Sequence, residues 1–168
     1  SRRQRQMCIR DRPYDVWERQ GTLQTTEGNV VHYGYIEKFI ERLGERFNIR
    51  EIAFDRWGAV QMVQNLEGMG FTVVPFGQGF KDMSPPTKEL MKLVLEEKIA
   101  HGGHPVLRWM MDNIFICTDP AGNIKPGKEK STEKIDGAVA TIMALDRAIR
   151  CGNDKAESVY DSRGLLFI

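Results

Sequence analysis

Apolar residues recur at helical spacing between positions 35 and 43, and two short apolar runs follow this stretch. The helical spacing predicts an amphipathic helix over residues 35–43. The runs at residues 51–55 and 71–76 predict strands buried on both faces, with a second helix over residues 59–66 between them. A strand, a helix and a strand in this order predict a βαβ unit, which has parallel strands and a right-handed crossover.

Weaker patterns flank this unit. Residues 17–26 predict a strand before the first helix. Downstream, Ser84 is typical of a helix N-cap, because the proline that follows it is tolerated in the first turn. The buried face of the helix that would begin there consists of four apolar residues: Leu90, Leu93, Val94 and Ile99.

The remaining sequence predicts a short helix, a hairpin and a long helix. The short helix covers residues 106–112, and residues 114–118 and 122–126 are typical of a β-hairpin. The long helix runs over residues 131–149. Together with the βαβ unit, these elements predict the α/β class, with a hairpin before the last long helix. The apolar stripe of the last helix consists of Ile135, Val139, Ile142 and Met143.

The two ends of the chain differ from the rest. Residues 1–12 (SRRQRQMCIRDR) are basic and without periodicity, and they resemble a foreign stretch such as translated adapter sequence. The alternative is a flexible basic arm that contacts nucleic acid. Residues 152–168 begin as a polar stretch that predicts a loose tail. We therefore expect a single domain over residues 13–151.

Composition narrows the class of protein. The chain has 168 residues, enough for one domain with a buried core, and its net charge of +1 favours no class of partner. No apolar run approaches the roughly 18 residues that a membrane span needs, and no signal peptide is recognisable. Cys8, Cys117 and Cys151 are far apart, which indicates reduced thiols and gives no zinc-ligand spacing.

Two aspartates are candidates for chemistry. Asp55 directly follows an apolar strand, and the carboxyl ends of strands in an open α/β sheet face the ligand crevice. Asp136 lies inside the predicted last helix beside its apolar stripe, where a buried carboxylate needs a cation such as a divalent metal ion. Simpler roles stay open for both. Asp55 can cap the next helix, and Asp136 with Gly137 can form a turn before a helix that begins later.

Four lysines stand close together in the sequence just before Asp136. Positive charge at this place could balance nucleic-acid phosphates beside a metal site. A lysine-rich solvated loop is the alternative, and it is commoner among proteins in general. The four are Lys125, Lys128, Lys130 and Lys134.

Two other motifs are weaker. Residues 122–129 match the first seven positions of the G-x-x-x-x-G-K-[ST] phosphate loop, but Glu129 replaces the hydroxyl that should ligate magnesium, so we dismiss a phosphate loop. His101 and His104, with Asn113 downstream, hint at a metal site, although no third histidine completes a zinc set. Packing at the edge of an active site is the alternative for these residues.

Taken together, several segments resemble the nuclease domain of phage terminase large subunits. The order and spacing of the segments carry the resemblance, which covers residues 14–150, whereas no single motif would suffice. The segments are IAFDRWGA at residues 52–59, the block at 73–88, HGGHPVL at 101–107 with Asp112 and Asn113, and KSTEKIDGAVA at 130–140.

This resemblance implies a ribonuclease H-like fold, in which a central mixed sheet flanked by helices carries acidic residues that bind two Mg²⁺ or Mn²⁺ ions. The implied activity is that of an endonuclease that cuts concatemeric double-stranded DNA during viral genome packaging, by two-metal phosphodiester hydrolysis. Asp55 and Asp136 occupy positions of catalytic metal ligands, and His101 and Asn113 would lie at the edge of the site. The implied partners of the intact protein are DNA, a small terminase subunit and a portal, in the cytoplasm of the host cell and away from membranes.

The chain also departs from the family's pattern. The resemblance implies a first catalytic aspartate on an opening strand ahead of the first helix, and an N-terminal ATPase motor before it. From the sequence given, we expect both the strand and the motor to be missing. Asp15 lies too close to the first helix to replace this aspartate, and Asp11 lies in the foreign-looking segment. We therefore expect a truncated domain with a weakened metal site. Two alternatives stay open: a non-catalytic DNA-binding or assembly fragment of the same fold, and another ribonuclease H-like nuclease of the resolvase or integrase type.

Overall fold

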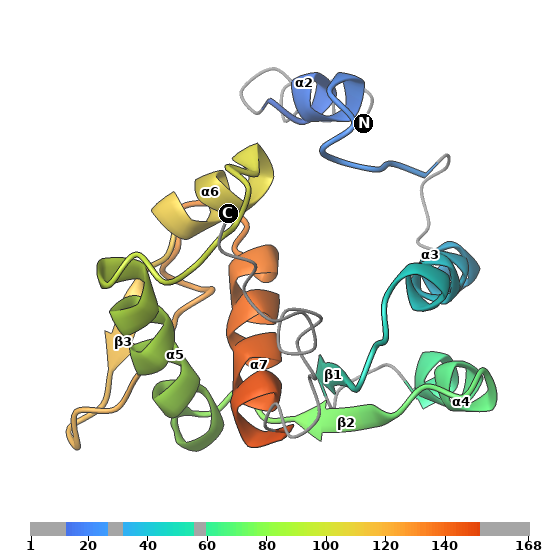
Figure 1. Cartoon of the computed structure of the whole chain (residues 1–168). Helices are drawn as coiled ribbons and strands as arrows, with labels where there is room; N and C mark the ends of the chain where they lie inside the picture. Colours follow the sequence, from blue (N-terminus) through green and yellow to red (C-terminus); the bar gives the residue numbers. More distant parts are fainter. Residues whose placement is uncertain (1–12, 27–31, 56–59, 152–168) are drawn as a thin grey trace, which may run out of the picture.

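The computed structural model describes residues 13–26, 32–55 and 60–151, which form helices and short strands (Figure 1). This mixture confirms the predicted α/β class. The strands make two small sheets within the described ranges, one parallel and one antiparallel. In chain order, the elements are α2 (Tyr14–Arg19), α3 (Tyr33–Arg46), β1 (Ile52–Asp55), α4 (Val60–Gly68), β2 (Val73–Phe76), α5 (Phe80–Leu95), α6 (Pro105–Asp112), β3 (Ile116–Thr118), β4 (Ile124–Pro126) and α7 (Asp136–Cys151).

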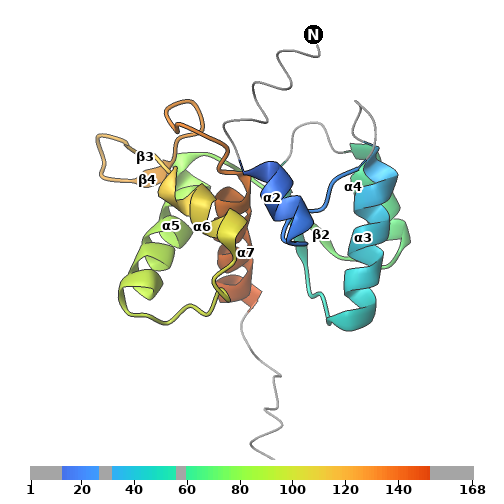
Figure 2. The same ribbon diagram turned by 90° about the horizontal axis from the view of Figure 1, so that it is seen from above.

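The predicted βαβ unit is present. β1 and β2 are parallel, with Ile52 in register with Val73 and Asp55 in register with Phe76, and α4 lies between them in the chain. Both strands lie between α7 on one side and α3 with α4 on the other (Figures 1 and 2). The prediction that both strands are buried on both faces is wrong: the residues of β1 are all half-buried, and in β2 Pro75 is exposed and only Phe76 is buried. The reason is that β1 and β2 form a sheet of two strands within the described residues, so each has an edge without a strand neighbour and is less enclosed than a strand inside a wider sheet.

The hydrophobic core lies where α5 and α7 pack together, and Phe76 of β2 joins it. All four apolar residues predicted for the stripe of the last helix are buried. Of the stripe predicted on α5, Leu90 is buried, but Val94 is exposed. Val94 lies one turn beyond Leu90, where this face of α5 opens into a pocket instead of meeting α7. The core consists of Phe76, Met83, Leu90, Ile135, Val139, Ile142 and Met143.

The predicted start of α5 at Ser84 is wrong. The helix begins at Phe80, after Gly79 in an extended conformation, and two prolines stand inside it. The prolines are the sixth and seventh residues of the helix, so each lacks an N–H that would otherwise bond to the carbonyl four residues earlier, and the helix continues in spite of these two missing bonds. Ser84 is buried, and its Oγ accepts a hydrogen bond of 3.2 Å from the backbone N–H of Ile124. Ser84 therefore joins α5 to β4 and does not cap a helix.

The strand predicted over residues 17–26 is also wrong, since Trp17 belongs to the helix α2. Trp17 is buried against Trp109 of α6, with ring centroids 5.3 Å apart, and Tyr14 lies 6.0 Å from the same ring. Tyr14 and Trp17 are three residues apart and so share one face of a helix, whereas a strand would place them on opposite faces. Tertiary packing of aromatic rings thus favours the helix.

Further downstream, the short helix and the hairpin match their predicted places. The last helix begins at Asp136, later than predicted, because Ser131 bonds back to Gly127 through both its N–H and its Oγ. None of the described helices is long and apolar enough to cross a membrane. The predictions for residues 1–12 and 152–168, and for the first residue of the helix after β1, lie outside the described residues.

Candidate functional site

Asp55 is the last residue of β1, where the parallel strands end. Its register partner is Phe76, and two residues after Phe76 the chain reaches Gln78. Gln78 lines a pocket of about 300 Å³ that Val139 of α7 also lines. The carboxyl edge of the small parallel sheet therefore faces the first turns of α7. Asp55 itself is half-buried at this edge.

Asp136 is the first residue of α7, and it points away from the core. Its side chain is 62% exposed, and its Oδ1 forms an ion pair with Nζ of Lys128, 3.0 Å away. The prediction of a carboxylate buried beside the stripe is therefore wrong. Ile135 is buried, and one step along the chain turns the next side chain outward. An acidic residue in the first turn also suits the positive end of the helix dipole.

Three of the four predicted lysines line one pocket, but each has a different contact. Nζ of Lys125 donates to the carbonyl oxygen of Gln78 at 3.2 Å and lies 5.1 Å from the ring centroid of Phe80. Nζ of Lys130 lies 5.3 Å from the ring centroid of Phe115. Lys128 is the one that pairs with Asp136. Lys134 is exposed and does not line the pocket.

The phosphate-loop look-alike at residues 122–129 is not a phosphate loop. Its middle forms the strand β4, which pairs with β3. The next helix begins only at Asp136, so the amides of the look-alike do not extend a helix N-terminus.

His101 and Asn113 have local roles. Nδ1 of His101 accepts a hydrogen bond of 3.2 Å from the N–H of Gly103, and His101 lines the pocket between α5 and α6 instead of the lysine pocket. Nδ2 of Asn113 donates to the carbonyl oxygen of Trp109 at 2.7 Å, and its Oδ1 accepts from the hydroxyl of Thr132 at 2.8 Å. Asn113 thus connects the end of α6 to the segment that leads into Asp136.

Ion pairs at the other end of α7 were not among the sequence-based candidates. Glu51, just before β1, accepts a hydrogen bond of 2.6 Å from Nε of Arg147, and this bond lowers the pKa of the Glu51 carboxyl. Asp146 is buried and accepts a bond of 2.7 Å from Nε of Arg150, whose pKa it raises. The spacing of four residues signals the second pair in the sequence. The first pair joins residues 96 positions apart, so no local pattern reveals it.

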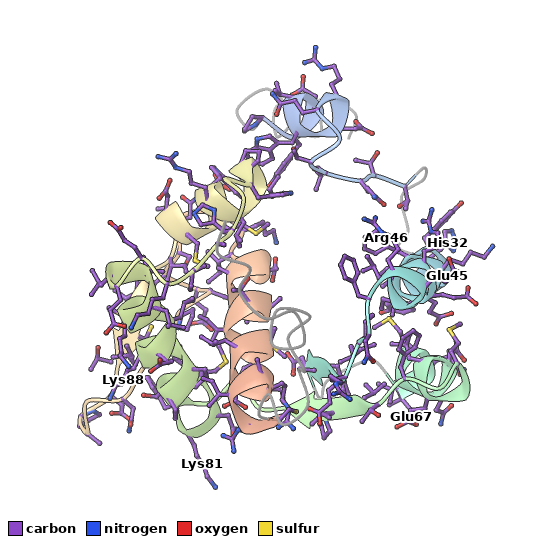
Figure 3. The ribbon with its side chains drawn as sticks, viewed as in Figure 1. His32, Glu45, Arg46, Glu67, Lys81 and Lys88 are labelled. Carbon is purple, nitrogen blue, oxygen red and sulfur yellow. The ribbon has the colours of Figure 1, made fainter. Side chains whose placement is uncertain are left out.

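Asp119 lies in the turn of the predicted hairpin and was not among the candidate site residues. Oδ1 of Asp119 accepts the N–H groups of Ala121 and Asn123, at 2.9 and 2.8 Å, and Oδ2 accepts from Nδ2 of Asn123 at 2.8 Å. These hydrogen bonds, mainly those from Asn123, lower the pKa of Asp119. The positive charge of Lys88, which is labelled in Figure 3, lowers this pKa further. Asp119 therefore stabilises the turn between β3 and β4.

The donors present suit a hard divalent cation in kind. Asp55 and Asp136 offer carboxylate oxygens, which Mg²⁺ and Mn²⁺ prefer, and Asp136 already holds a cationic group. In residues 13–26, 32–55 and 60–151, no three His, Cys, Asp or Glu side chains lie close enough to hold a metal ion. The described residues thus include two candidate carboxylates but no complete set of metal ligands.

The chain has relatives among known proteins. It is similar to the "Terminase, large subunit" of Enterobacteria phage HK97, with 41% identity over 138 residues, which are 81% of this chain and 27% of the relative. It is also similar to "Protein YmfN" of Escherichia coli strain K12, with 33% identity over 138 residues, 81% of this chain and 30% of that protein. The chain therefore spans less than a third of the length of either relative.

A solved structure and a protein family agree with the first of these relatives. The fold matches the "Crystal structure of the HK97 bacteriophage large terminase" with a TM-score of 0.78 and 40% identity, over 87% of this chain and 31% of that chain. Residues 2–151 match the family "Terminase large subunit, endonuclease domain". This chain therefore belongs to the family of terminase large-subunit endonuclease domains.

Proposed function

We propose that this chain is a divalent-metal-dependent endodeoxyribonuclease domain that cuts concatemeric double-stranded DNA during viral genome packaging. The observation that carries the proposal is the placement of two acidic residues within the family match. Asp55 ends β1 at the carboxyl edge of the parallel strands, and Asp136 stands exposed at the start of α7 beside the lysine pocket. Such positions suit catalytic carboxylates, because they rest on rigid elements and remain accessible to a large substrate.

In this proposal Asp55 and Asp136 hold Mg²⁺ or Mn²⁺. Two such ions, when bound, supply a nucleophile at neutral pH and stabilise the charge that develops on the phosphate. The chain's own contribution is positioning. Packing of α7 on β1 and α5 fixes where each carboxylate stands, and the pocket lysines supply positive charge against the DNA backbone.

The lysines Lys125, Lys128, Lys130 and Lys134 would contact phosphates without regard to base sequence. In the intact protein we expect a small terminase subunit and a portal as further partners, and the cytoplasm of the host cell as the place of action. In that setting, these partners would determine where the DNA is cut.

The test is cleavage of supercoiled plasmid by the 168-residue chain with Mg²⁺ or Mn²⁺. We expect nicking or linearisation that EDTA abolishes, and loss of about 100-fold or more in rate for Asp55→Asn and for Asp136→Asn, as for removal of a group that acts in the transition state. Asp15→Asn is the matched control, because Asp15 is also an exposed aspartate in an ion pair, with Arg19 at 2.9 Å. Cleavage at the parental rate by either site variant would show that the assignment is wrong.

A second candidate is a non-catalytic DNA-binding or assembly fragment of the same fold. It is favoured by the lack of a three-ligand metal site among the described residues. This candidate predicts DNA binding that weakens steeply with salt, without any cutting. Cleavage by the chain that requires a divalent ion would exclude it.

A further inference from the structure

The ion pair between Lys128 and Asp136 places a protein cation where the proposed function requires a metal cation. Nζ of Lys128 lies 3.0 Å from Oδ1 of Asp136. We propose that Lys128 is a placeholder for the metal, which holds Asp136 when no ion is bound and moves to a DNA phosphate when the ion arrives. This inference rests on the proposed function, because it assumes that Asp136 is a metal ligand.

Lys128 is the member of the lysine group that can make this move. Lys125 is held by the carbonyl oxygen of Gln78 and by the ring of Phe80. Lys130 lies over the ring of Phe115. The recorded partner of Lys128 is Asp136 itself, so the arrival of another cation at this carboxylate frees the ammonium group.

The exposure of the pair makes the exchange possible. The side chains of Lys128 and Asp136 are 48% and 62% exposed, and ion pairs of this kind contribute little net stability. A divalent ion attracts a carboxylate with twice the charge of an ammonium group at the same distance, so it competes with Lys128 for Asp136. A buried pair would instead lock the carboxylate, because separation of buried charges is strongly unfavourable.

The exchange has a consequence for DNA binding. Without a metal ion, Lys128 pairs with Asp136 and must leave this pair to contact a phosphate. With a metal ion, Lys128 becomes an additional phosphate contact. Metal binding and DNA binding therefore favour each other, and by linkage each raises the affinity of the other by the same factor.

The first experiment measures Mn²⁺ binding to the 168-residue chain by titration calorimetry in the absence of DNA. We expect Lys128→Gln to bind Mn²⁺ about two- to fivefold more tightly than the parent, the range that an exposed ion pair can supply. Lys98→Gln is the matched control, because Lys98 also forms an exposed ion pair, with Glu96 at 2.7 Å, and does not line the lysine pocket. This control removes the same charge but leaves the pair of Lys128 with Asp136 intact, so its Mn²⁺ affinity should remain close to that of the parent.

The second experiment measures binding of a short DNA duplex over a range of salt concentrations, with and without Ca²⁺ as an oxygen-preferring ion. With Ca²⁺, Lys128→Gln should weaken binding and reduce the slope of log affinity against log salt by about one phosphate contact. Without a divalent ion, the same substitution should change the slope much less, because the ammonium group is then held by Asp136.

These outcomes separate the inference from the proposed function. Unchanged or weaker Mn²⁺ binding by Lys128→Gln, or no Mn²⁺ binding by either protein, would overturn the placeholder role. A slope reduced equally with and without Ca²⁺ would also overturn it. Tighter Mn²⁺ binding by Lys128→Gln in a chain that does not cut plasmid would support the inference and leave the endonuclease proposal refuted.

Discussion

The core beneath the candidate site yields a quantitative prediction at Ile142. This residue of α7 is 1% exposed and packs in the cluster that includes Phe76 and Leu90. Replacement by alanine removes three buried carbons, at roughly 0.8 kcal/mol each, which gives about 2.4 kcal/mol of lost transfer free energy. The cavity that remains adds to this, and measured costs of such changes are about 2–5 kcal/mol. We expect Ile142→Ala to lower the free energy of unfolding by about 3 kcal/mol.

Urea unfolding followed by circular dichroism measures this change, because a shift of the midpoint at constant slope reports stability alone. In thermal unfolding, the same change should lower Tm by about 6–12 °C for a chain of this size. Ile149→Ala is the matched control on the same helix. Ile149 is 55% exposed, so its replacement should change the free energy of unfolding by less than about 0.5 kcal/mol.

The comparison of the two isoleucines decides whether α7 packs as described. A cost below about 1 kcal/mol for Ile142→Ala would mean that the site collapses or that α7 does not cover the core. Ile149 lies on the same face two turns later, beyond the core, so an equal cost for Ile149→Ala would mean that the core extends further along α7 than described.

Three other substitutions test contacts away from the core. Glu51→Gln breaks the pair with Arg147, which lowers the pKa of Glu51. The pair therefore stabilises the fold at neutral pH, and this stabilisation is lost as the pH falls below about 4. The difference in Tm between parent and variant should narrow over that range. Trp17→Ala should remove amide protection in α2 while hydrogen exchange in α5 and α7 stays slow, since the aromatic contact fastens α2 alone to α6. Gly127→Ala places a Cβ against Sγ of Cys117 and should cost about 1–3 kcal/mol in urea unfolding, and a second change of Cys117 to alanine should restore most of it.

The sequence predicted the elements whose apolar spacing is long or whose turn chemistry is explicit. The stripe on α7 and the strand–helix–strand order both depend on local periodicity, which the fold preserves. The predicted start of α5 was wrong because Ser84, followed by two prolines, fits the sequence pattern of a helix N-cap. In the structure, the Ser84 hydroxyl instead accepts a hydrogen bond from the N–H of Ile124, 40 residues later. The helical state of Trp17 depends on its contact with Trp109, a residue far away in the sequence that no local pattern around Trp17 could reveal. Contacts of this kind become visible only in the folded chain.

At the candidate site, the sequence predicted which residues matter but not how they are exposed. Asp136 was expected beside the core because a helix over residues 131–149 would carry it past the stripe. The backbone bond from Ser131 to Gly127 holds the segment before the helix in a turn, so the helix begins only at Asp136, whose side chain points to solvent. A single turn thus makes Asp136 an exposed residue with an ion pair to Lys128, where a buried carboxylate was expected.

The geometry of the two carboxylates depends on contacts far from them. The pair between Glu51 and Arg147 joins the start of β1 to the last turns of α7, while Ala53 packs against the core. These contacts fix β1 relative to α7, and thereby fix Asp55 relative to Asp136, whose own contact with Lys128 is exposed and replaceable. Rigid support with replaceable local contacts is the combination that a site requires if it must admit both a metal ion and a DNA backbone. Loss of the Glu51 pair should therefore loosen the site without touching either candidate ligand.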